Sequence, residues 1–292
     1  MNTTGDQWAI TLAICAAFAW GIGAHLIRQG LHHLDAQRGS AISIISTTLC
    51  LCVVVSLTGL PSELWCQGLI AFAVAGLVHP VLSRFLAFEA NRRVGATISN
   101  TFDSTSPLFA AVLAIIILGE VLTTGIVIGT LMTILGVTFI CWQPVKPKSI
   151  MRIAVYLAIG AAFVRAIGVI AGKFGLNSLP SPIVGALATF TVSAIVALII
   201  ARVQKKTIWR HLGSAGTWWF VLLGLVSALA TVCMYSALLH TDAIVVIPII
   251  AASPLFTWLS GWILGLEQLG ISVAIAIAIT VVGVSIIGLS TL

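Results

Sequence analysis

Charged residues inside long apolar stretches are the places where this sequence could do chemistry. Arg165 follows Arg152 by 13 residues, or about 20 Å of helix, which places its guanidinium deep in an apolar segment. That group could hold a substrate carboxylate, or it could form a structural pair with an acid or a helix carbonyl. Arg84 and Asp103 lie nine residues before and ten residues after Arg93, so antiparallel helices would hold them at similar depth. We expect a structural ion pair there, with proton or substrate coupling by Asp103 as the alternative.

Several other residues in the same stretches could line a cavity. His79 lies deeper than Arg84 and could titrate there, or it could be a hydrogen-bonded core residue. Trp20 lies 145 residues before Arg165 and could form an apolar wall at the corresponding place. The remaining candidates are polar or aromatic residues inside apolar segments: Asn100, Phe163, Tyr235 and Trp258.

Prolines and glutamates also recur at informative places. Pro107, Pro248 and Pro254 each remove a helical hydrogen bond and predict kinks that could act as hinges, although membrane helices also carry proline for packing alone. Glu120 and Glu267 occur at predicted turns, each beside the start of the following helix. A carboxylate there complements the helix dipole, so we expect both to be structural.

The elements that position these residues must lie in lipid. The sequence is 60% hydrophobic and only 8% charged, which is too few ionic groups to cover a water-facing surface. A helix needs roughly 20 apolar residues to cross a bilayer, so the chain accommodates about ten crossings. The predicted spans are 8–28, 40–58, 66–88, 96–118, 122–142, 151–173, 182–201, 216–238, 243–264 and 269–290. We therefore expect an all-α, polytopic membrane protein of ten transmembrane helices.

An internal repeat divides the chain. Residues 105–140 and 252–287 align without a gap at an offset of 147, and 12 of the 36 pairs are identical. The shared SPLF sequence begins at Ser106 and at Ser253. The first helices match at an offset of 145, which pairs Phe18 with Phe163, Gly23 with Gly168 and Arg28 with Lys173. Five helices is an odd number, so the second copy enters the membrane in the opposite orientation. The predicted repeats, 1–143 and 144–292, are therefore inverted, as in many transporters with a site at the midplane.

These marks resemble the drug/metabolite transporter superfamily, and in particular its ten-helix EamA-type members. The resemblance rests on the small-residue-rich first helix of each half, Phe88-Glu89-Ala90 or Tyr235-Ser236-Ala237 at the end of the third, and the SPLF, Glu and Gly that follow. It implies secondary transport, and amino-acid exporters are the most similar members. Small drug-exporting relatives carry a substrate-binding carboxylate in the first helix, and neither half has an acid at the matching place.

Other classes of protein fit less well. The sequence has no HExxH, GxSxG, paired intramembrane aspartates or Walker A pattern, so we expect no enzyme, no catalytic residue and no cofactor. The six cysteines form no ligand pattern, so no metal is expected. The predicted function is export of amino acids or similar small metabolites by alternating access. Cationic drug efflux is the alternative, and an exchanger of organic phosphates would need more than one deep basic residue.

Loop charges predict the orientation. Most Lys and Arg residues fall in the gaps after odd-numbered spans, whereas the even gaps hold almost only Lys173. Basic loops stay in the cytoplasm, so both termini are expected outside, in a bacterial inner membrane. The expected partners are a small-molecule substrate and the lipid bilayer, with no nucleic acid. We expect a monomer, and the sequence leaves proton coupling open.

Overall fold

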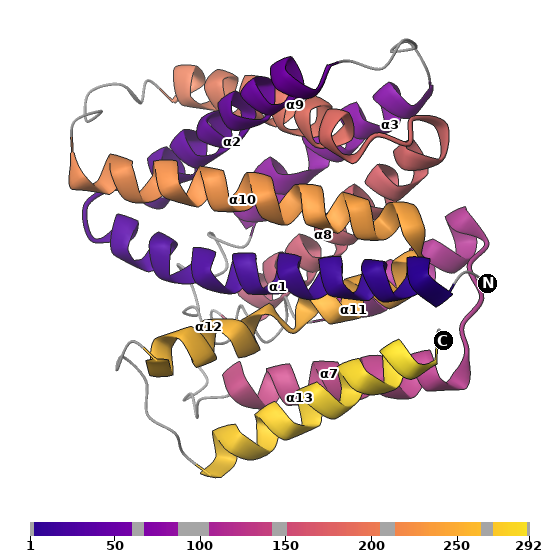
Figure 1. Cartoon of the computed structure of the whole chain (residues 1–292). Helices are drawn as coiled ribbons and strands as arrows, with labels where there is room; N and C mark the ends of the chain where they lie inside the picture. The colour runs from indigo at the N-terminus through magenta and orange to yellow at the C-terminus, as the bar shows by residue number, and fades with distance from the viewer. Residues whose placement is uncertain are drawn as a thin grey trace.

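The computed structural model describes residues 3–59, 67–86, 105–141, 151–204, 214–263 and 271–290 (Figure 1). These residues form helices and turns, and no strand occurs among them. Two predicted site residues, Asn100 and Asp103, lie outside the described residues, as does Glu267. The structure therefore leaves the predicted Arg84–Asp103 pair as a prediction.

Within the described ranges, ten helical segments follow the order of the ten predicted spans. In the first half they are α1 (Thr3–Leu31), α2 (Ala36–Thr58), α3 (Gln67–Gly76) with the π-helical η1 (Leu77–Leu82), α6 (Ser106–Leu113) with η2 (Ala114–Leu118), and α7 (Thr124–Cys141). In the second half they are α8 (Met151–Ser178), α9 (Pro182–Val203), α10 (Ala215–His240), α11 (Ala243–Ala251) with α12 (Ser253–Ile263), and α13 (Ile271–Leu289).

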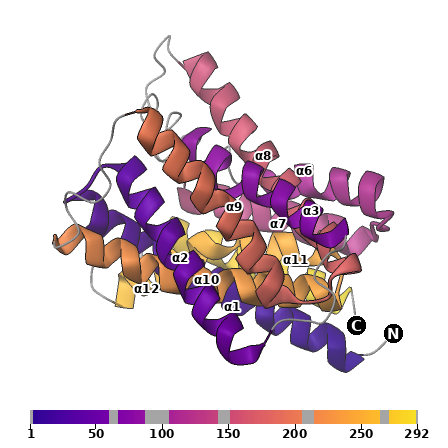
Figure 2. The ribbon, with the colours of Figure 1, turned by 90° about the horizontal axis from the view of Figure 1, so that it is seen from above.

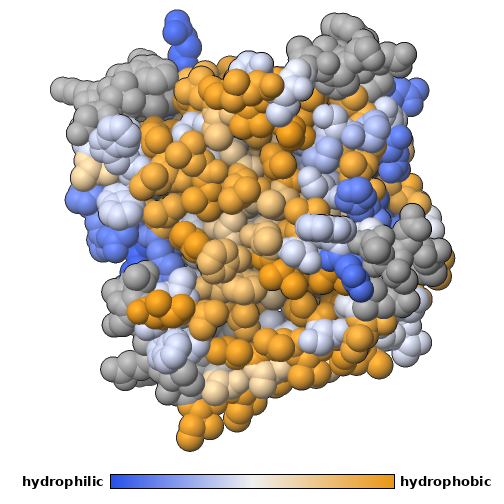
Figure 3. Space-filling view, viewed as in Figure 1, coloured by the Kyte–Doolittle hydropathy of each residue, from blue (hydrophilic) through white to orange (hydrophobic). Residues whose placement is uncertain are grey.

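Length and polarity identify these segments as membrane helices. Within the described residues, seven segments are long and apolar enough to cross a bilayer, and three shorter ones are also apolar. Apolar side chains cover the middle of the face seen in Figure 3, and hydrophilic residues gather toward its two ends. The predicted fold class is confirmed: the protein is an all-α, polytopic membrane protein.

Interruptions of the spans occur close to prolines. The ninth span breaks between α11 and α12, just before Pro254, whereas Pro248 lies inside α11. Pro107 lies in the first turn of α6, where a backbone N–H would have no partner within the helix, so its absence in proline removes no helical hydrogen bond. The third span is interrupted at His79, whose backbone is extended (φ −136°, ψ 132°). Sequence reasoning missed that break, although Pro80 signals it, because a residue that precedes proline is pushed away from helical geometry.

Helix packing relates the two halves by an approximate two-fold axis. The first helix of each half packs on the third of the other, so α1 contacts α10 and α8 contacts α3. In the same way α1 contacts α12 while α8 contacts α6, and α2 contacts α10 while α9 contacts α3. The last helices, α7 and α13, pack on each other along one side of the bundle (Figure 1), which is the far side in the view of Figure 2. This interchange is the arrangement that inverted repeats produce.

Small residues permit the α7–α13 contact. A Cβ atom on Gly283 would lie 2.7 Å from the backbone nitrogen of Thr133 and 2.8 Å from the carbonyl oxygen of Gly129. Between helices in lipid the association depends on van der Waals contact, so backbones that approach this closely are stabilising. Gly136, which the repeat alignment pairs with Gly283, is as closely packed, since its Cβ would lie 2.7 Å from the carbonyl oxygen of Ala276, so both repeated glycines serve packing.

Candidate functional site

Three basic side chains come together between α2, the end of the third span and α8. Arg84 donates from Nη1 to Ser43 Oγ at 3.2 Å, and His79 Nδ1 lies 2.7 Å from Ser83 Oγ. The charges of Arg84 and Arg165 both act on His79, and Arg165 also acts on Arg84. These three residues are called the basic cluster below.

Backbone geometry explains how the basic cluster assembles. The extended backbone at His79 turns this part of the third span away from regular helix. A Cβ atom on Gly168 would lie 2.5 Å from the Cβ of His79, so α8 approaches His79 with a glycine. Gly168 follows Arg165 by three residues, which puts both on the same face of α8. The sequence thus places Arg165 on the helix face that packs against the third span.

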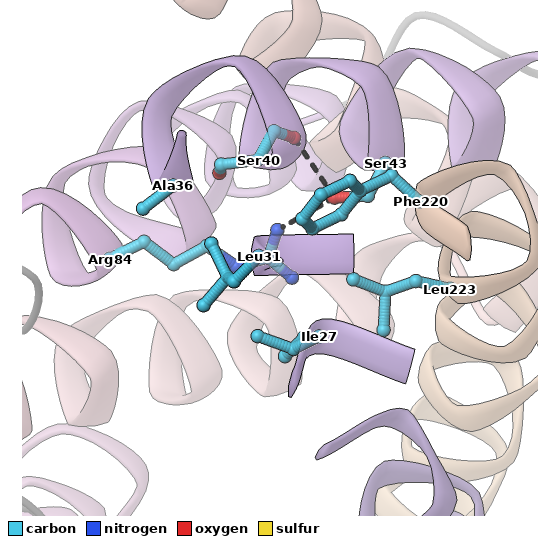
Figure 4. Close-up of a pocket in the computed structure, with 8 residues that line it drawn as sticks. All are labelled: Ile27, Leu31, Ala36, Ser40, Ser43, Arg84, Phe220 and Leu223. Carbon is cyan, nitrogen blue, oxygen red and sulfur yellow. Dashed lines mark hydrogen bonds between the residues drawn. The ribbon is translucent and has the colours of Figure 1, made fainter. Parts of the chain in front are cut away.

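A small pocket lies beside Arg84, between α1, α2 and α10 (Figure 4). Its cavity volume is about 20 Å³, which is room for about one water molecule. Ser43 donates to the carbonyl oxygen of Ser40 at 2.9 Å and accepts from Arg84, so one hydroxyl connects the guanidinium to α2. The lining residues are Ile27, Leu31, Ala36, Ser40, Ser43, Arg84, Phe220 and Leu223.

The sequence identified only part of this pocket. Arg84 was a candidate, but Ser40, Ser43 and Phe220 were missed. Hydroxyl residues inside the second span were the available signal, because a polar group in lipid must find a partner. Phe220 carried no signal, since an aromatic residue in an apolar helix is ordinary core.

The aromatic candidates lie apart from this pocket. The Tyr235 hydroxyl lies 3.1 Å from Thr189 Oγ1, and the ring is buried against Phe72. Trp258 is buried and stacks on Trp262 with ring centroids 6.4 Å apart. Trp20 is half-buried against the apolar core. Among the described residues Tyr235 and Trp20 pack between helices and Trp258 stacks within α12, and the pocket lining does not include these three.

Two equivalent aromatic contacts join the repeats. Phe18 of α1 meets Phe256 of α12 edge to face, with centroids 5.8 Å apart and rings at 88°. Phe163 of α8 meets Phe109 of α6 at 5.6 Å and 78°. The repeat alignment pairs Phe18 with Phe163 and Phe109 with Phe256. The phenylalanine of SPLF therefore connects each fourth span to the first helix of the other half.

Polar contacts differ between these two interfaces. His25 Nε2 lies 2.9 Å from both the Thr257 carbonyl oxygen and Ser260 Oγ, which ties α1 to α12. The repeat equivalent of His25 is Ile170, which offers no such bond. In the other interface Ser106 Oγ donates to the carbonyl oxygen of Ala162 at 3.1 Å. Sequence reasoning missed His25, whose position inside the first span was the available signal.

Glu120 has a different partner from the predicted one. Its Oε1 accepts from the Ala243 N–H and its Oε2 from the Ile244 N–H, each at 2.9 Å. The carboxylate therefore has the structural role expected of it, but the hydrogen bonds it accepts come from α11 of the other half and not from the following helix, α7. Sequence spacing could not show this, because the two ends meet only in the folded bundle. Burial raises the pKa of the Glu120 carboxyl above its usual range, against the two N–H bonds, which lower it.

Lys173 lies beside Glu120 and not in a loop. Its Nζ donates to the carbonyl oxygens of Leu238 and Thr241, the latter at 2.9 Å. These carbonyls belong to the end of α10, where a cation complements the helix dipole. The charge of Lys173 also acts on Glu120. Glu120 of the first half and Lys173 of the second half thus both bind the connection between α10 and α11.

Inverted helical repeats that meet around a pocket beside buried basic groups are typical of one class of protein, the membrane transporters. Residues 7–142 and 152–289 each match the EamA-like transporter family, and the chain belongs to that family. The predicted membership of the EamA-type drug/metabolite transporters is thereby confirmed.

Solved structures agree on the fold. A solved structure described as "Crystal structure of protein" superposes with a TM-score of 0.83 at 16% sequence identity. The match covers 97% of this chain and 98% of the other. The comparison with curated proteins gave no match. Its membership of the EamA-like transporter family makes the protein a membrane transporter of the drug/metabolite type.

Proposed function

We propose that this transporter exports amino acids or similar small metabolites by alternating access through a midplane cavity between its inverted repeats. The observation that carries the proposal is the basic cluster of His79, Arg84 and Arg165 beside the pocket of Figure 4. Guanidinium groups bind carboxylates with two parallel hydrogen bonds, so Arg165 is the proposed carboxylate-binding residue.

The pocket chemistry supports an anionic or zwitterionic substrate. Arg84 is one of the lining residues, and the others are apolar or carry a hydroxyl. A buried cation repels a cationic drug, so the basic cluster argues against the alternative of multidrug efflux. Two arginines in one cluster favour a second candidate, an organic phosphate or a dicarboxylate, because each arginine can hold one anionic group.

Counterflow in proteoliposomes tests the proposed substrate class. We expect labelled amino acids to exchange across wild-type vesicles, and we expect Arg165→Ala to lose at least about 90% of that exchange, since each lost charged hydrogen bond is worth about 1.5–3 kcal/mol. Arg165→Lys keeps the charge but loses the planar fork, so an intermediate rate is expected. Arg202→Ala, an exposed arginine in the last turn of α9, is the matched control and should exchange normally.

The substrate panel separates the alternatives. Exchange of phosphate esters or dicarboxylates without amino acids would favour the second candidate. Uptake of a cationic drug with silence from every anion would contradict the proposal and favour efflux. Normal amino-acid exchange by Arg165→Ala would remove Arg165 from the binding site.

The orientation has its own test. We propose that both termini lie outside, because most Lys and Arg residues occur in the gaps after odd-numbered spans. In a variant without native cysteines, Lys148→Cys should react with a membrane-impermeant maleimide only from the cytoplasmic side. Labelling from the outside in intact cells would reverse the assignment.

A further inference from the structure

The contact between Glu120 and α11 joins the two halves at one end of the bundle. Glu120 belongs to the connection between η2 and α7 in the first half, and its two acceptor bonds reach the first two residues of α11 in the second half. The side chain is 9% exposed. Both chain ends, the α10–α11 connection and the start of α7 lie at this same end (Figure 1). We call it the terminal face.

The helix that Glu120 holds is buried from its first residue. Every residue from Ala243 to Ile249 is buried, and Ala243 and Val246 are fully covered. Three elements of the first half, α1, α6 and α7, pack against α11. In contrast, α12, toward the opposite end of the same span, includes Trp262 at 47% and Ile263 at 70% exposure. The ninth span is thus buried at the terminal face, whereas the end of α12 presents apolar side chains at the surface of the bundle.

The pocket lies toward the opposite end. Its lining includes Ile27 and Leu31 at the end of α1 and Ala36 at the start of α2. The connection between these helices lies at the other end of the bundle from the chain termini (Figure 1). The structure therefore combines a tightly packed terminal face with a small pocket nearer the opposite face, as expected of a state with access from one side.

We propose that Glu120 is an inter-repeat latch, which holds the terminal face closed and must release α11 before substrate can pass that face. The inference rests on the proposed alternating-access function. Lys173 assists by holding the end of α10, so that the carboxylate meets a fixed pair of N–H groups. Symmetry supports the role, because the repeat alignment pairs Glu120 with Glu267 and Lys173 with Arg28. The sequence thus repeats one acid and one base at corresponding places in the two halves.

Hydrogen exchange in lipid nanodiscs tests the latch without any substrate. In Glu120→Ala at one fixed pH, we expect the amides of Val245, Val246, Ile247 and Ile249 to exchange at least about tenfold faster than in wild type, because the loss of charged bonds lets water reach α11. Exchange in α2 and α9 should not change. Glu120→Gln keeps the shape and one acceptor, so a smaller rise is expected, and it carries the test where the alanine variant does not fold.

Asp242→Asn is the matched control. Asp242 is a neighbouring exposed acid at the N-cap of α11, but its side chain makes no capping bond, so this variant should exchange like wild type. A rise confined to Ala243 and Ile244 would overturn the latch and leave an ordinary helix cap. Unchanged exchange, or an equal rise throughout α2 and α9, would also overturn it. If wild type moves no amino acid, the proposed function fails while the exchange result still decides the latch.

Discussion

Replacement of Gly76 by Val should prevent recovery of folded protein from detergent-solubilised membranes. A Cβ atom on Gly76 would lie 2.3 Å from the Thr189 carbonyl oxygen and 3.0 Å from the Val192 Cβ. The Gly76 carbonyl oxygen also accepts from Ser193 Oγ at 2.8 Å, so the two backbones are tied at this distance. Backbone atoms cannot yield as a flexible side chain can, and we expect a loss of about 3 kcal/mol or more in the free energy of unfolding.

Gly160→Val provides the control for that experiment. Gly160 lies in α8, and an added Cβ would meet only Leu86 Cδ1 at 3.8 Å, which is ordinary contact. This variant should elute as a single peak in size-exclusion chromatography and unfold near the wild-type temperature. If Gly76→Val also behaves like wild type, then α3 and α9 do not pack as closely as the structure has them.

Replacement of Phe220 by Ala should cost about 3 kcal/mol of unfolding free energy and enlarge the pocket. The ring is 2% exposed and lies over two glycines, since a Cβ on Gly39 would lie 2.1 Å from it and a Cβ on Gly30 would lie 2.6 Å from it. Glycine has no side chain that could fill the vacated space, so removal of the ring leaves a cavity between α1, α2 and α10. Thermal unfolding in detergent, followed by tryptophan fluorescence, measures the loss.

Phe174→Ala is the matched variant for the same measurement. Phe174 is 44% exposed, so its removal leaves no enclosed cavity, and we expect a change below about 1 kcal/mol. In lipid the surrounding tails are as apolar as the core, so the cost at Phe220 comes from lost packing contacts. Equal destabilisation by both substitutions would contradict that explanation and would place Phe220 outside the helix interface.

The two aromatic contacts explain why the internal repeat was visible in the sequence. Phe109 and Phe256 belong to the repeated SPLF, and each packs against a phenylalanine of the first helix of the other half. The contact needs an aromatic residue at four places at once, which is more specific than apolar character. The two halves therefore share the phenylalanines that hold them together. In contrast, Trp20 and Arg165, which occupy the matching place in the two first helices, are different residues.

The candidate site was predictable only in part. The cost of a charged group in lipid identified Arg84, Arg165 and His79 individually, and the structure brings them together. The pairing of Arg84 with Asp103 stays a prediction, because Asp103 lies outside the described residues. The observed partner of Arg84, Ser43, comes from a helix 41 residues earlier in the chain, and nothing in local spacing indicates it.

Apolar length and internal repetition by themselves determined the class of this protein. A membrane helix needs about 20 consecutive apolar residues, so the ten spans could be inferred from apolar stretches in the sequence. The internal repeat of five spans then implied the inverted halves. Only the tertiary structure decided which helix ends meet. Glu120 caps α11, 123 residues away, because two connections of opposite halves converge at one face of the bundle. Such contacts depend on how the helices pack, and helix packing cannot be deduced from the spacing of residues along the chain.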